Sequence, residues 1–213
     1  MLSLLMMFIF NYSNLIDPLL RDIREFVPGF AGMNAGNKVL DVCCGTGEQV
    51  FEYARNGFTA TGIDNDPDMI KTALKNKIKH NLANVSFQQA DATSLPFSDC
   101  HFDCASISFG LHDKGKIARE KVVSEMKRIV KPDGTLIFID FQVPLPANIW
   151  ALFARTVEFL ASGDHYRGFK DYLKNGGMSS LINTSHLHEV ERTSLKNGII
   201  IAVRAVKSRT AFP

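Results

Sequence analysis

The sequence predicts an α/β fold in which a mostly parallel sheet carries helices on both faces, and three observations support this prediction. Between Val39 and Phe141, short apolar runs alternate with stretches of helical periodicity, which is typical of strands joined by crossover helices. The first apolar run leads into a turn of small residues, VLDVCCGTGEQ at positions 39–49, as a strand does when it enters a helix through a tight turn. The length of 213 residues suits one such domain with a small addition.

The periodicity predicts the elements in chain order. An N-terminal helix with apolar residues around Leu20 and Ile23 should stop before Pro28. Strands are expected at the apolar runs. Two of these runs start at Val39 and Phe102, and the others cover 59–64, 85–89, 135–141, 187–193 and 198–206. A helix is expected after the first strand, over 46–56. A second helix should follow the second strand, with a buried stripe of Ile70, Ala73, Leu74 and Ile78, and a third should follow the fourth strand, with a stripe from Ala118 to Val130.

Charge and cysteine content weigh against some classes of function. Lys and Arg number 24 and Asp and Glu 22, so the formal net charge of +2 gives no basic field of the kind that binds nucleic acid. The four cysteines lack the C-x-x-C spacing of zinc or redox motifs. Reduced thiols without such spacing indicate a cytoplasmic protein.

The first ten residues, MLSLLMMFIF, are apolar. They lack the basic start and the cleavage site of a signal peptide, and they are too short to span a bilayer. We therefore expect no transmembrane segment. Packing of this stretch on the domain and peripheral contact with a membrane surface both stay open.

The turn after the first strand suits a ligand that carries positive charge. Gly45 and Gly47 lack a Cβ, so a ligand can approach the backbone N–H groups at the start of the helix. Asp41 places a carboxylate at the end of the strand, where it would repel the phosphates of a dinucleotide. S-Adenosylmethionine carries an ammonium and a sulfonium group and no phosphate, so it fits this corner better.

On these residues, VLDVCCGTG resembles motif I of the class I S-adenosylmethionine-dependent methyltransferases, with Cys43 at the usual place of the first glycine. The variant D-x-C-C-G-T-G is similar to that of the ubiquinone/menaquinone C-methyltransferases, and RIVKPDGTLIFIDF resembles a second signature of the family. The resemblance covers roughly residues 35 to 206. It implies a Rossmann-like fold with a seven-stranded, mostly parallel sheet and an antiparallel last strand.

The same resemblance implies an organisation of residues 1–213 as a single methyltransferase domain. Its parts are an N-terminal helical cover (1–34), a cofactor-binding core (35–141), an aromatic substrate cover (142–186) and closing strands (187–206).

The resemblance also implies which residues bind S-adenosylmethionine. Asp64, at the end of the second strand, is the candidate for the ribose, and Asp91 and Ala92 are the candidates for adenine. The other candidates are Tyr12, Asp41, Cys43, Gly45, Thr46, Gly47, Asn65, Met69 and Ser108. A structural role stays open for Tyr12, as a half-buried ring, and for Asp91, as a turn-former.

Methyl transfer requires alignment of the reactants and exclusion of water, and it needs neither a metal nor a covalent nucleophile. If the acceptor must lose a proton, His112 and His165 are candidate bases, with Tyr166 beside His165 as a further catalytic candidate. His186 and His188 alternate along a strand, but no third ligand accompanies them, so no metal is expected.

An aromatic segment follows the fifth strand. Trp150, Phe153, Val157 and Leu160 recur there at helical spacing, which predicts a buried helix face. In the family that the chain resembles, this position holds a cover over the substrate. Both interpretations stay open.

The predicted function is transfer of a methyl group from S-adenosylmethionine, which leaves S-adenosylhomocysteine, to a small-molecule acceptor such as a quinol carbon. The alternatives are another small acceptor, such as a phenol, an amine or arsenite, and a non-catalytic module that binds the cofactor or a partner protein. Arsenite is disfavoured because Cys43 and Cys44 belong to the predicted cofactor turn. The expected state is a monomer or a homodimer.

Overall fold

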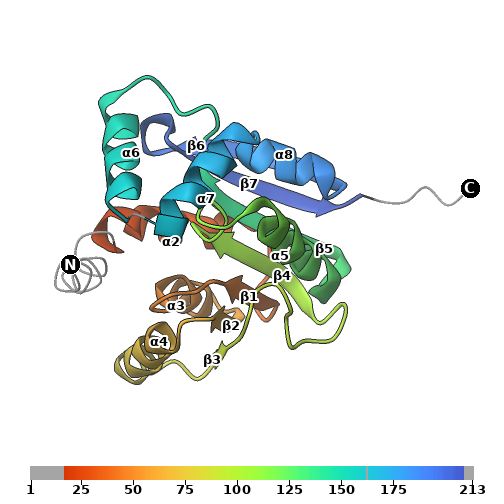
Figure 1. Cartoon of the computed structure of the whole chain (residues 1–213). Helices are drawn as coiled ribbons and strands as arrows, with labels where there is room; N and C mark the ends of the chain where they lie inside the picture. Colours follow the sequence, from red (N-terminus) through yellow and green to blue (C-terminus); the bar gives the residue numbers. More distant parts are fainter. Residues whose placement is uncertain (1–16, 162, 209–213) are drawn as a thin grey trace, which may run out of the picture.

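The computed structural model describes residues 17–161 and 163–208, which contain one seven-stranded sheet (Figure 1). The strands lie in the order β3-β2-β1-β4-β5-β7-β6. Their bounds are β1 Lys38–Val42, β2 Thr59–Asp64, β3 Val85–Gln89, β4 Phe102–Ser108, β5 Val130–Phe141, β6 Leu187–Leu195 and β7 Ile200–Lys207. Strand β7 is antiparallel to β5 and β6, while the other neighbours are parallel, so the predicted fold class is confirmed.

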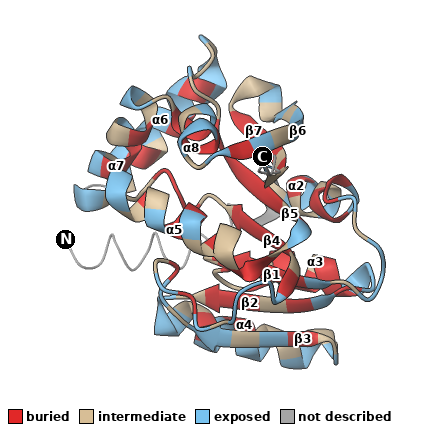
Figure 2. Cartoon of the chain, turned by 90° about the vertical axis from the view of Figure 1, so that its right-hand side faces the viewer, coloured by how far each residue is buried: buried red, intermediate tan, exposed pale blue. Residues whose placement is uncertain are grey.

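Helices cover both faces of the sheet (Figures 1 and 2). One face carries α2 (Asp17–Phe30), α3 (Glu48–Arg55) and α4 (Pro67–His80), and the other carries α5 (Lys116–Ile129), α7 (Gly163–Lys174) and α8 (Gly177–Thr184). Helix α6 (Ile149–Ala161) packs on α7. A short 3₁₀ turn, Lys196–Gly198, joins β6 to β7. Within the described residues, no helix has both the length and the apolar character needed to cross a membrane.

Strand β1 lies inside the sheet, between β2 and β4, and its residues face the two layers of the core alternately. Leu40 and Val42 pack with α5, α7 and α8, whereas Val39 packs with α2 and α3. Since both faces are covered, every residue of β1 after Lys38 is buried. The buried polar residue of the strand, Asp41, points by this alternation toward the α2 and α3 layer.

Helix α2 continues through Pro28, so the prediction that it stops before this residue was wrong. Pro28 has no N–H, which leaves the carbonyl of Arg24, one turn earlier, without its helical donor. The side-chain amide of Gln49 on α3 donates to that carbonyl at an N–O distance of 3.3 Å. A donor from the neighbouring helix thus replaces the missing bond, and α2 ends at Phe30.

Helix α4 buries less of its apolar stripe than the sequence predicted. Ile70 and Ala73 are buried, but Leu74 and Ile78 are 46% and 81% exposed. Among the described residues, helix α4 packs mainly on α3, β2 and the edge strand β3, which leaves these two side chains on its outer side.

The interpretation of the α6 stripe as a buried face was also wrong. Trp150, Phe153 and Leu160 are 51%, 52% and 57% exposed. Helix α6 turns small residues and one acid inward instead, namely Ala151, Ala154 and Glu158. This arrangement places a carboxylate inside the cover formed by α6 and α7.

Candidate active site

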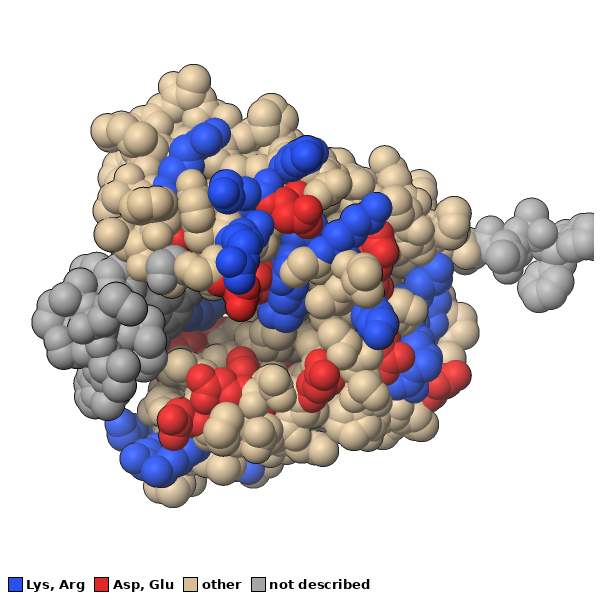
Figure 3. All heavy atoms as spheres, viewed as in Figure 1, with Lys and Arg blue, Asp and Glu red and all other residues tan. Residues whose placement is uncertain are grey.

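The carboxyl ends of the parallel strands meet at one edge of the sheet, and the strand order reverses there between β1 and β4. In open α/β sheets this switch point forms the crevice in which ligands bind. Figure 3 shows a hollow between the part of the molecule that contains β1 to β3 and the part that contains α6 and α7. Acidic side chains gather along its lower rim and basic side chains along its upper rim.

The turn after β1 has the backbone geometry of a glycine-rich loop. Cys43, Gly45 and Gly47 have φ values of 59°, 53° and 88°, in the left-handed region that favours glycine. A Cβ on Gly47 would lie 2.6 Å from the ring of Phe87, so this glycine permits close packing on β3. A Cβ on Gly45 would meet no atom within 4 Å. Gly45 therefore borders open space, where a ligand can approach its backbone.

The carboxylate of Asp64 is fixed against this turn. The N–H of Gly45 donates to Oδ2 at 2.9 Å, and the N–H of Asp66 donates to Oδ1 at 3.0 Å. Each oxygen retains acceptor capacity, so Asp64 can also accept from ribose hydroxyls, as the predicted role requires. Asp66 itself accepts from the N–H of Asp68 at 2.8 Å and caps α4.

Asp41 lies deeper than its position near the strand end indicated, because it is only 3% exposed. The hydroxyl of Ser106 on β4 donates to its Oδ1 at 2.7 Å. Burial raises the pKa of Asp41 to about 7, against the opposing effects of the Ser106 hydrogen bond and the charge of Arg24. The carboxyl group is therefore partly protonated near neutral pH, and a cation bound nearby would favour its ionised form.

Asp91 forms a turn, which is the structural role that the sequence left open. Its Oδ1 accepts from the N–H and the hydroxyl of Thr93 at 2.8 and 2.9 Å, and these hydrogen bonds lower its pKa. The side chain is exposed at the end of β3, and the following Ala92 is buried. This geometry leaves the predicted contact with adenine untested.

The remaining predicted cofactor residues lie around the same edge. Thr46 and Met69 are half-buried, and Asn65 is exposed. The hydroxyl of Ser108, at the end of β4, is buried and has no hydrogen-bond partner among the described residues. An unpaired buried hydroxyl at a strand end suits contact with a ligand. Tyr12 lies outside the described residues.

Lys114 belongs to this crevice, and the sequence analysis missed it. Its ammonium lies 3.1 Å from Asp113 Oδ1, and it also interacts with Cys43 and Asp64. Burial lowers the pKa of Lys114, but its neighbours, Asp113 and Asp64 among them, raise it overall. The Cys43 thiol stays neutral, since burial raises its pKa to about 12. A single lysine after a loop carries no motif that would have revealed this position.

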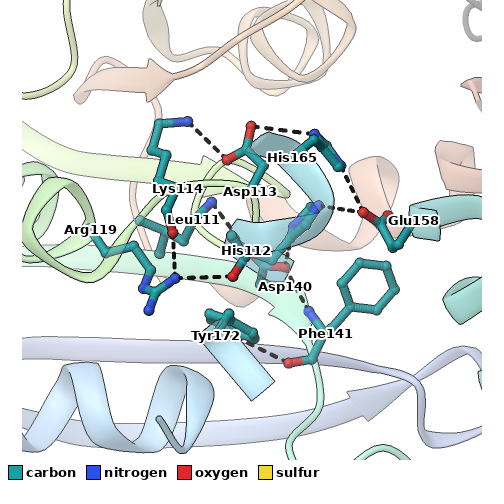
Figure 4. A network of polar contacts seen from close by, with 11 residues as sticks. Leu111, His112, Asp113, Lys114, Arg119, Asp140, Phe141, Glu158, His165 and Tyr172 are labelled. Atoms are coloured by element: carbon teal, nitrogen blue, oxygen red, sulfur yellow. Dashed lines mark hydrogen bonds and ion pairs between the residues drawn. The ribbon is translucent and has the colours of Figure 1, made fainter. Parts of the chain in front are cut away.

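A second polar cluster adjoins the crevice at the ends of β4 and β5, and Asp140 is its innermost residue (Figure 4). This carboxylate is fully buried. Its Oδ1 accepts from Nδ1 of His112 at 2.7 Å and from the N–H of Phe141 at 2.8 Å. Its Oδ2 accepts from the N–H groups of Leu111 and His112 at 3.2 and 3.1 Å. Asp140 thereby fixes the ring of His112, whose Nε2 points toward the cover.

The cover helices supply the rest of the cluster. Glu158 on α6 places Oε2 2.7 Å from Nε2 of His165 on α7 and 3.6 Å from Nε2 of His112. Nδ1 of His165 faces Asp113 Oδ2 at 3.9 Å. The structure thus joins two predicted histidines to acids that the sequence analysis did not select. Glu158 is the one acid on the apolar helix α6, and that contrast was a usable signal.

Helix α7 is held closely on the loop after β4. The guanidinium of Arg119, which is 2% exposed, pairs with Asp171 on α7 and donates to the carbonyl of Lys114 in the loop. A Cβ on Gly168 would lie 2.1 Å from the carbonyl oxygen of Asp113, so only glycine permits this approach. The distance between His112 and His165 therefore depends on the packing of α7 on this loop, which no local sequence motif predicts.

Tyr166, the third catalytic candidate, has other contacts. Its ring packs edge-on against Phe159 at a centroid distance of 5.3 Å, and the ammonium of Lys170 lies 4.9 Å from its centroid. These contacts are with the cover helices rather than with the cluster around His112.

The facing carboxylates determine the charge of His112. Burial lowers its pKa, but Asp140, Glu158 and Asp113 raise it to about 9. At neutral pH the ring therefore carries a proton on both nitrogens. A protonated ring cannot accept a further proton, so the role of base stays a prediction for a state in which His112 has lost that proton.

Comparison with known proteins relates this core to one family. Residues 39–134 match the family described as "Methyltransferase domain". The ubiquinone/menaquinone biosynthesis C-methyltransferase UbiE of Pseudomonas putida is 35% identical over 125 residues, which are 57% of this chain and 48% of that protein. The chain therefore spans about half the length of the curated relatives that it matches.

Solved structures share the fold over most of the chain. The protein PH0226 from Pyrococcus horikoshii has a TM-score of 0.70 at 16% identity, with 91% of each chain covered. A SAM-dependent methyltransferase from Aquifex aeolicus has a TM-score of 0.62 at 19% identity, with 85% of this chain and 88% of that chain covered. At these identities the structures show the fold alone. Together with the sequence matches, they confirm the resemblance to class I S-adenosylmethionine-dependent methyltransferases.

Proposed function

We propose that this chain, which carries a class I S-adenosylmethionine-dependent methyltransferase domain, transfers the cofactor's methyl group to a small acceptor of the phenol or quinol type. The observation that carries the proposal is the corner between Gly45 and Asp64. There, a backbone that borders open space lies 2.9 Å from a carboxylate fixed at the next strand end. This pairing suits a ligand with a charged amino-acid part and a ribose.

The charges of the crevice support a cationic cofactor. Asp64 ends β2, Asp91 follows β3, and Asp41 is the buried penultimate residue of β1, and none of these three neighbouring strand ends offers the glycine pattern of a phosphate site. The charge of Asp64 is among those that raise the pKa of Lys114. A crevice that attracts this internal cation is also suited to the ammonium and sulfonium of S-adenosylmethionine.

The acceptor class is inferred from the other side of the crevice. Phe141 and Phe169 pack edge-on against His112, with ring centroids 4.9 and 6.1 Å from its own. Both rings are almost fully buried, so they support the polar cluster from behind, and its exposed side at His165 suits a flat ring that carries a hydroxyl group. The similarity to the quinone C-methyltransferase UbiE supports a quinol, although it covers only 57% of this chain.

The reaction is an in-line displacement. The acceptor's electron pair forms a bond to the methyl carbon while the carbon–sulfur bond breaks, and the sulfur keeps the bonding pair as a neutral thioether. The acceptor's proton leaves to solvent. The chain contributes by holding the cofactor at the strand ends, placing the loop from Ser108 to Asp113 beside the methyl group, and excluding water with α6 and α7.

The test is calorimetric titration of the purified chain with S-adenosylmethionine and with S-adenosylhomocysteine. We expect micromolar binding of both ligands, weakened at least about tenfold in Asp64→Ala, since the ribose contact is lost. Asp68→Ala is the matched control, because it removes an exposed acid from the same region without touching the crevice. Incubation with hydroquinones should then yield a product one methyl group heavier. Absence of heat and of a thermal shift with both ligands would reject the proposal.

A further inference from the structure

We infer that His112, Glu158 and His165 form a binding site for one divalent transition-metal ion, which holds a hydroxyl oxygen of the methyl acceptor. The metal site stands on the geometry of the cluster alone. The role toward the acceptor rests on the function proposed above. The inference departs from the prediction, made from the sequence, that no metal is bound.

The spacing of the three donors suits a common ion. Their ligand atoms lie within 4.8 Å of one another, and the distances from Glu158 Oε2 to the two imidazole nitrogens are 2.7 and 3.6 Å. Ligands about 2.1 Å from a tetrahedral ion lie roughly 3.4 Å apart, so the observed distances bracket the required value. The His112–Glu158 separation of 3.6 Å is longer than a hydrogen bond, which leaves room between them.

Both histidines are oriented as metal ligands usually are. Nδ1 of His112 is held by Asp140 at 2.7 Å, and Nδ1 of His165 faces Asp113 at 3.9 Å. In each ring, the other nitrogen, Nε2, points at Glu158 (Figure 4). A carboxylate hydrogen-bonded to the far nitrogen, as Asp140 is to Nδ1 of His112, is the common arrangement around bound metals. Asp113 lies on the corresponding side of the His165 ring, beyond hydrogen-bond distance.

The charge of the cluster favours a divalent ion. The side chains of Asp140 and Glu158 are 0% and 9% exposed, and without a metal the protonated ring of His112 is the cation that faces both. A divalent ion would displace that proton from His112 and, with two neutral imidazoles as ligands, would balance both carboxylates. Asp113 already has Lys114 as a partner at 3.1 Å. Imidazole and carboxylate donors suit zinc, iron, cobalt and nickel better than magnesium or calcium.

The site joins three parts of the chain that are far apart in sequence. His112 comes from the loop after β4, Glu158 from α6 and His165 from α7. A bound ion would therefore fasten the cover to the methyl-facing loop. The side chain of His165 is 37% exposed, which gives an ion and an acceptor access from solvent.

Three protein ligands leave a coordination position for the acceptor. A phenolic hydroxyl that binds there loses its proton to solvent more easily, because the ion stabilises the phenolate. The phenolate then supplies the electron pair for the carbon–methyl or oxygen–methyl bond, and the sulfur keeps the pair of the broken carbon–sulfur bond. No oxidant or reductant is needed.

The test is a titration of chelator-treated protein with Co²⁺, followed by its visible absorption, and competition of the bound Co²⁺ with Zn²⁺. We expect one equivalent to bind, and Glu158→Gln and His165→Ala each to weaken binding by about tenfold or more. The matched control is His188→Ala, which removes an exposed histidine from the edge strand β6 and should leave the affinity unchanged. Circular dichroism checks that each variant is folded, and His165→Asn replaces His165→Ala if that variant is not.

Unchanged Co²⁺ affinity in folded Glu158→Gln and His165 variants would overturn the inference, as would absence of binding to the unaltered chain. Sulfur-to-metal charge-transfer bands would also overturn it, because they would place the ion on the cysteines. The titration needs neither cofactor nor acceptor. Metal binding without any binding of S-adenosylmethionine would therefore reject the proposed function and support the metal site. Binding of S-adenosylmethionine without metal binding would support the proposed function and reject the metal site.

Discussion

The two sides of the crevice are built in different ways. The proposed cofactor side, from β1 to the turn after β3, consists of contiguous stretches with backbone amides and strand-end acids, as in the hydrogen bond from Gly45 to Asp64. The proposed acceptor side consists of side chains from a loop and two helices, as in the contact between Glu158 and His165. The cofactor side is therefore encoded by a local sequence motif, whereas the acceptor side forms only when α6 and α7 pack on the domain.

This difference matches what the chain shares with its relatives. The methyltransferase match covers residues 39–134, which include the cofactor side and His112. Asp140, Glu158 and His165 lie beyond it. A common cofactor can be served by a shared core, whereas each acceptor needs its own cover. The acceptor side is therefore where this chain's specificity should reside.

The largest expected effect is a loss of kcat that distinguishes the acceptor side from the cofactor side. Glu158→Gln should lower kcat by roughly 10³-fold, within the range for loss of a group that activates an acceptor, while the affinity for S-adenosylmethionine stays unchanged. Asp64→Ala should show the opposite pattern, with affinity for the cofactor lost first. Steady-state kinetics and calorimetry on the same preparations measure both. Loss of cofactor affinity in Glu158→Gln would break the distinction between the two sides.

The extent of prediction from sequence follows the same division. The strand order, the turn at Gly45 and Gly47 and the placing of Asp64 beside it were accessible, because periodicity and a motif encode them locally. Glu158 was not selected, because the apolar positions of α6 suggested a core helix, although it is the one acid of that helix. Its actual orientation depends on the close approach of α7 to the loop after β4, which Gly168 permits. Such packing has no signature in a single sequence.

The second prediction concerns the stability that the fold loses when the buried Asp41 on the cofactor side ionises. Asp41 has its pKa raised from 3.8 to about 7, so the protonated form is the one that the fold favours. The stability from this preference is complete below pH 3.8, falls as the pH rises, and is gone above about pH 7. Relative to Asp41→Asn, the free energy of unfolding of the unaltered chain should decline by roughly 2–3 kcal/mol between about pH 5 and pH 8.

Urea denaturation of both proteins across this pH range measures the Asp41 effect. Other titrating groups, His112 among them, are common to the two proteins and cancel in the difference. Parallel curves would show that the carboxylate is not penalised by burial. Saturation with S-adenosylmethionine should reduce the decline, because a nearby cation favours the ionised carboxylate.

The third prediction separates the two glycines of the turn. Gly47→Ala should cost roughly 2–3 kcal/mol of folding stability, since its Cβ would lie 2.6 Å from Phe87 at a positive φ. Gly45→Ala should cost only about 1 kcal/mol, from backbone strain, because its Cβ meets no atom. Its main effect should be weaker cofactor binding. Equal stability losses in urea, with unchanged cofactor affinity for Gly45→Ala, would contradict a ligand at this turn.

The smallest expected effect concerns the outer face of the cover. Trp150→Ser and Phe153→Ser should each change the free energy of unfolding by less than about 0.5 kcal/mol, because both rings are about half exposed on α6. Phe169→Ala is the contrasting variant, since that ring is 1% exposed, and it should cost about 3 kcal/mol or more. Urea unfolding of the full chain compares all three. A loss above about 2 kcal/mol at Trp150 would mean that another part of the chain or a second copy covers this face. In that case α6 would be a core helix after all, and the acceptor side would be specified by packing on both of its faces.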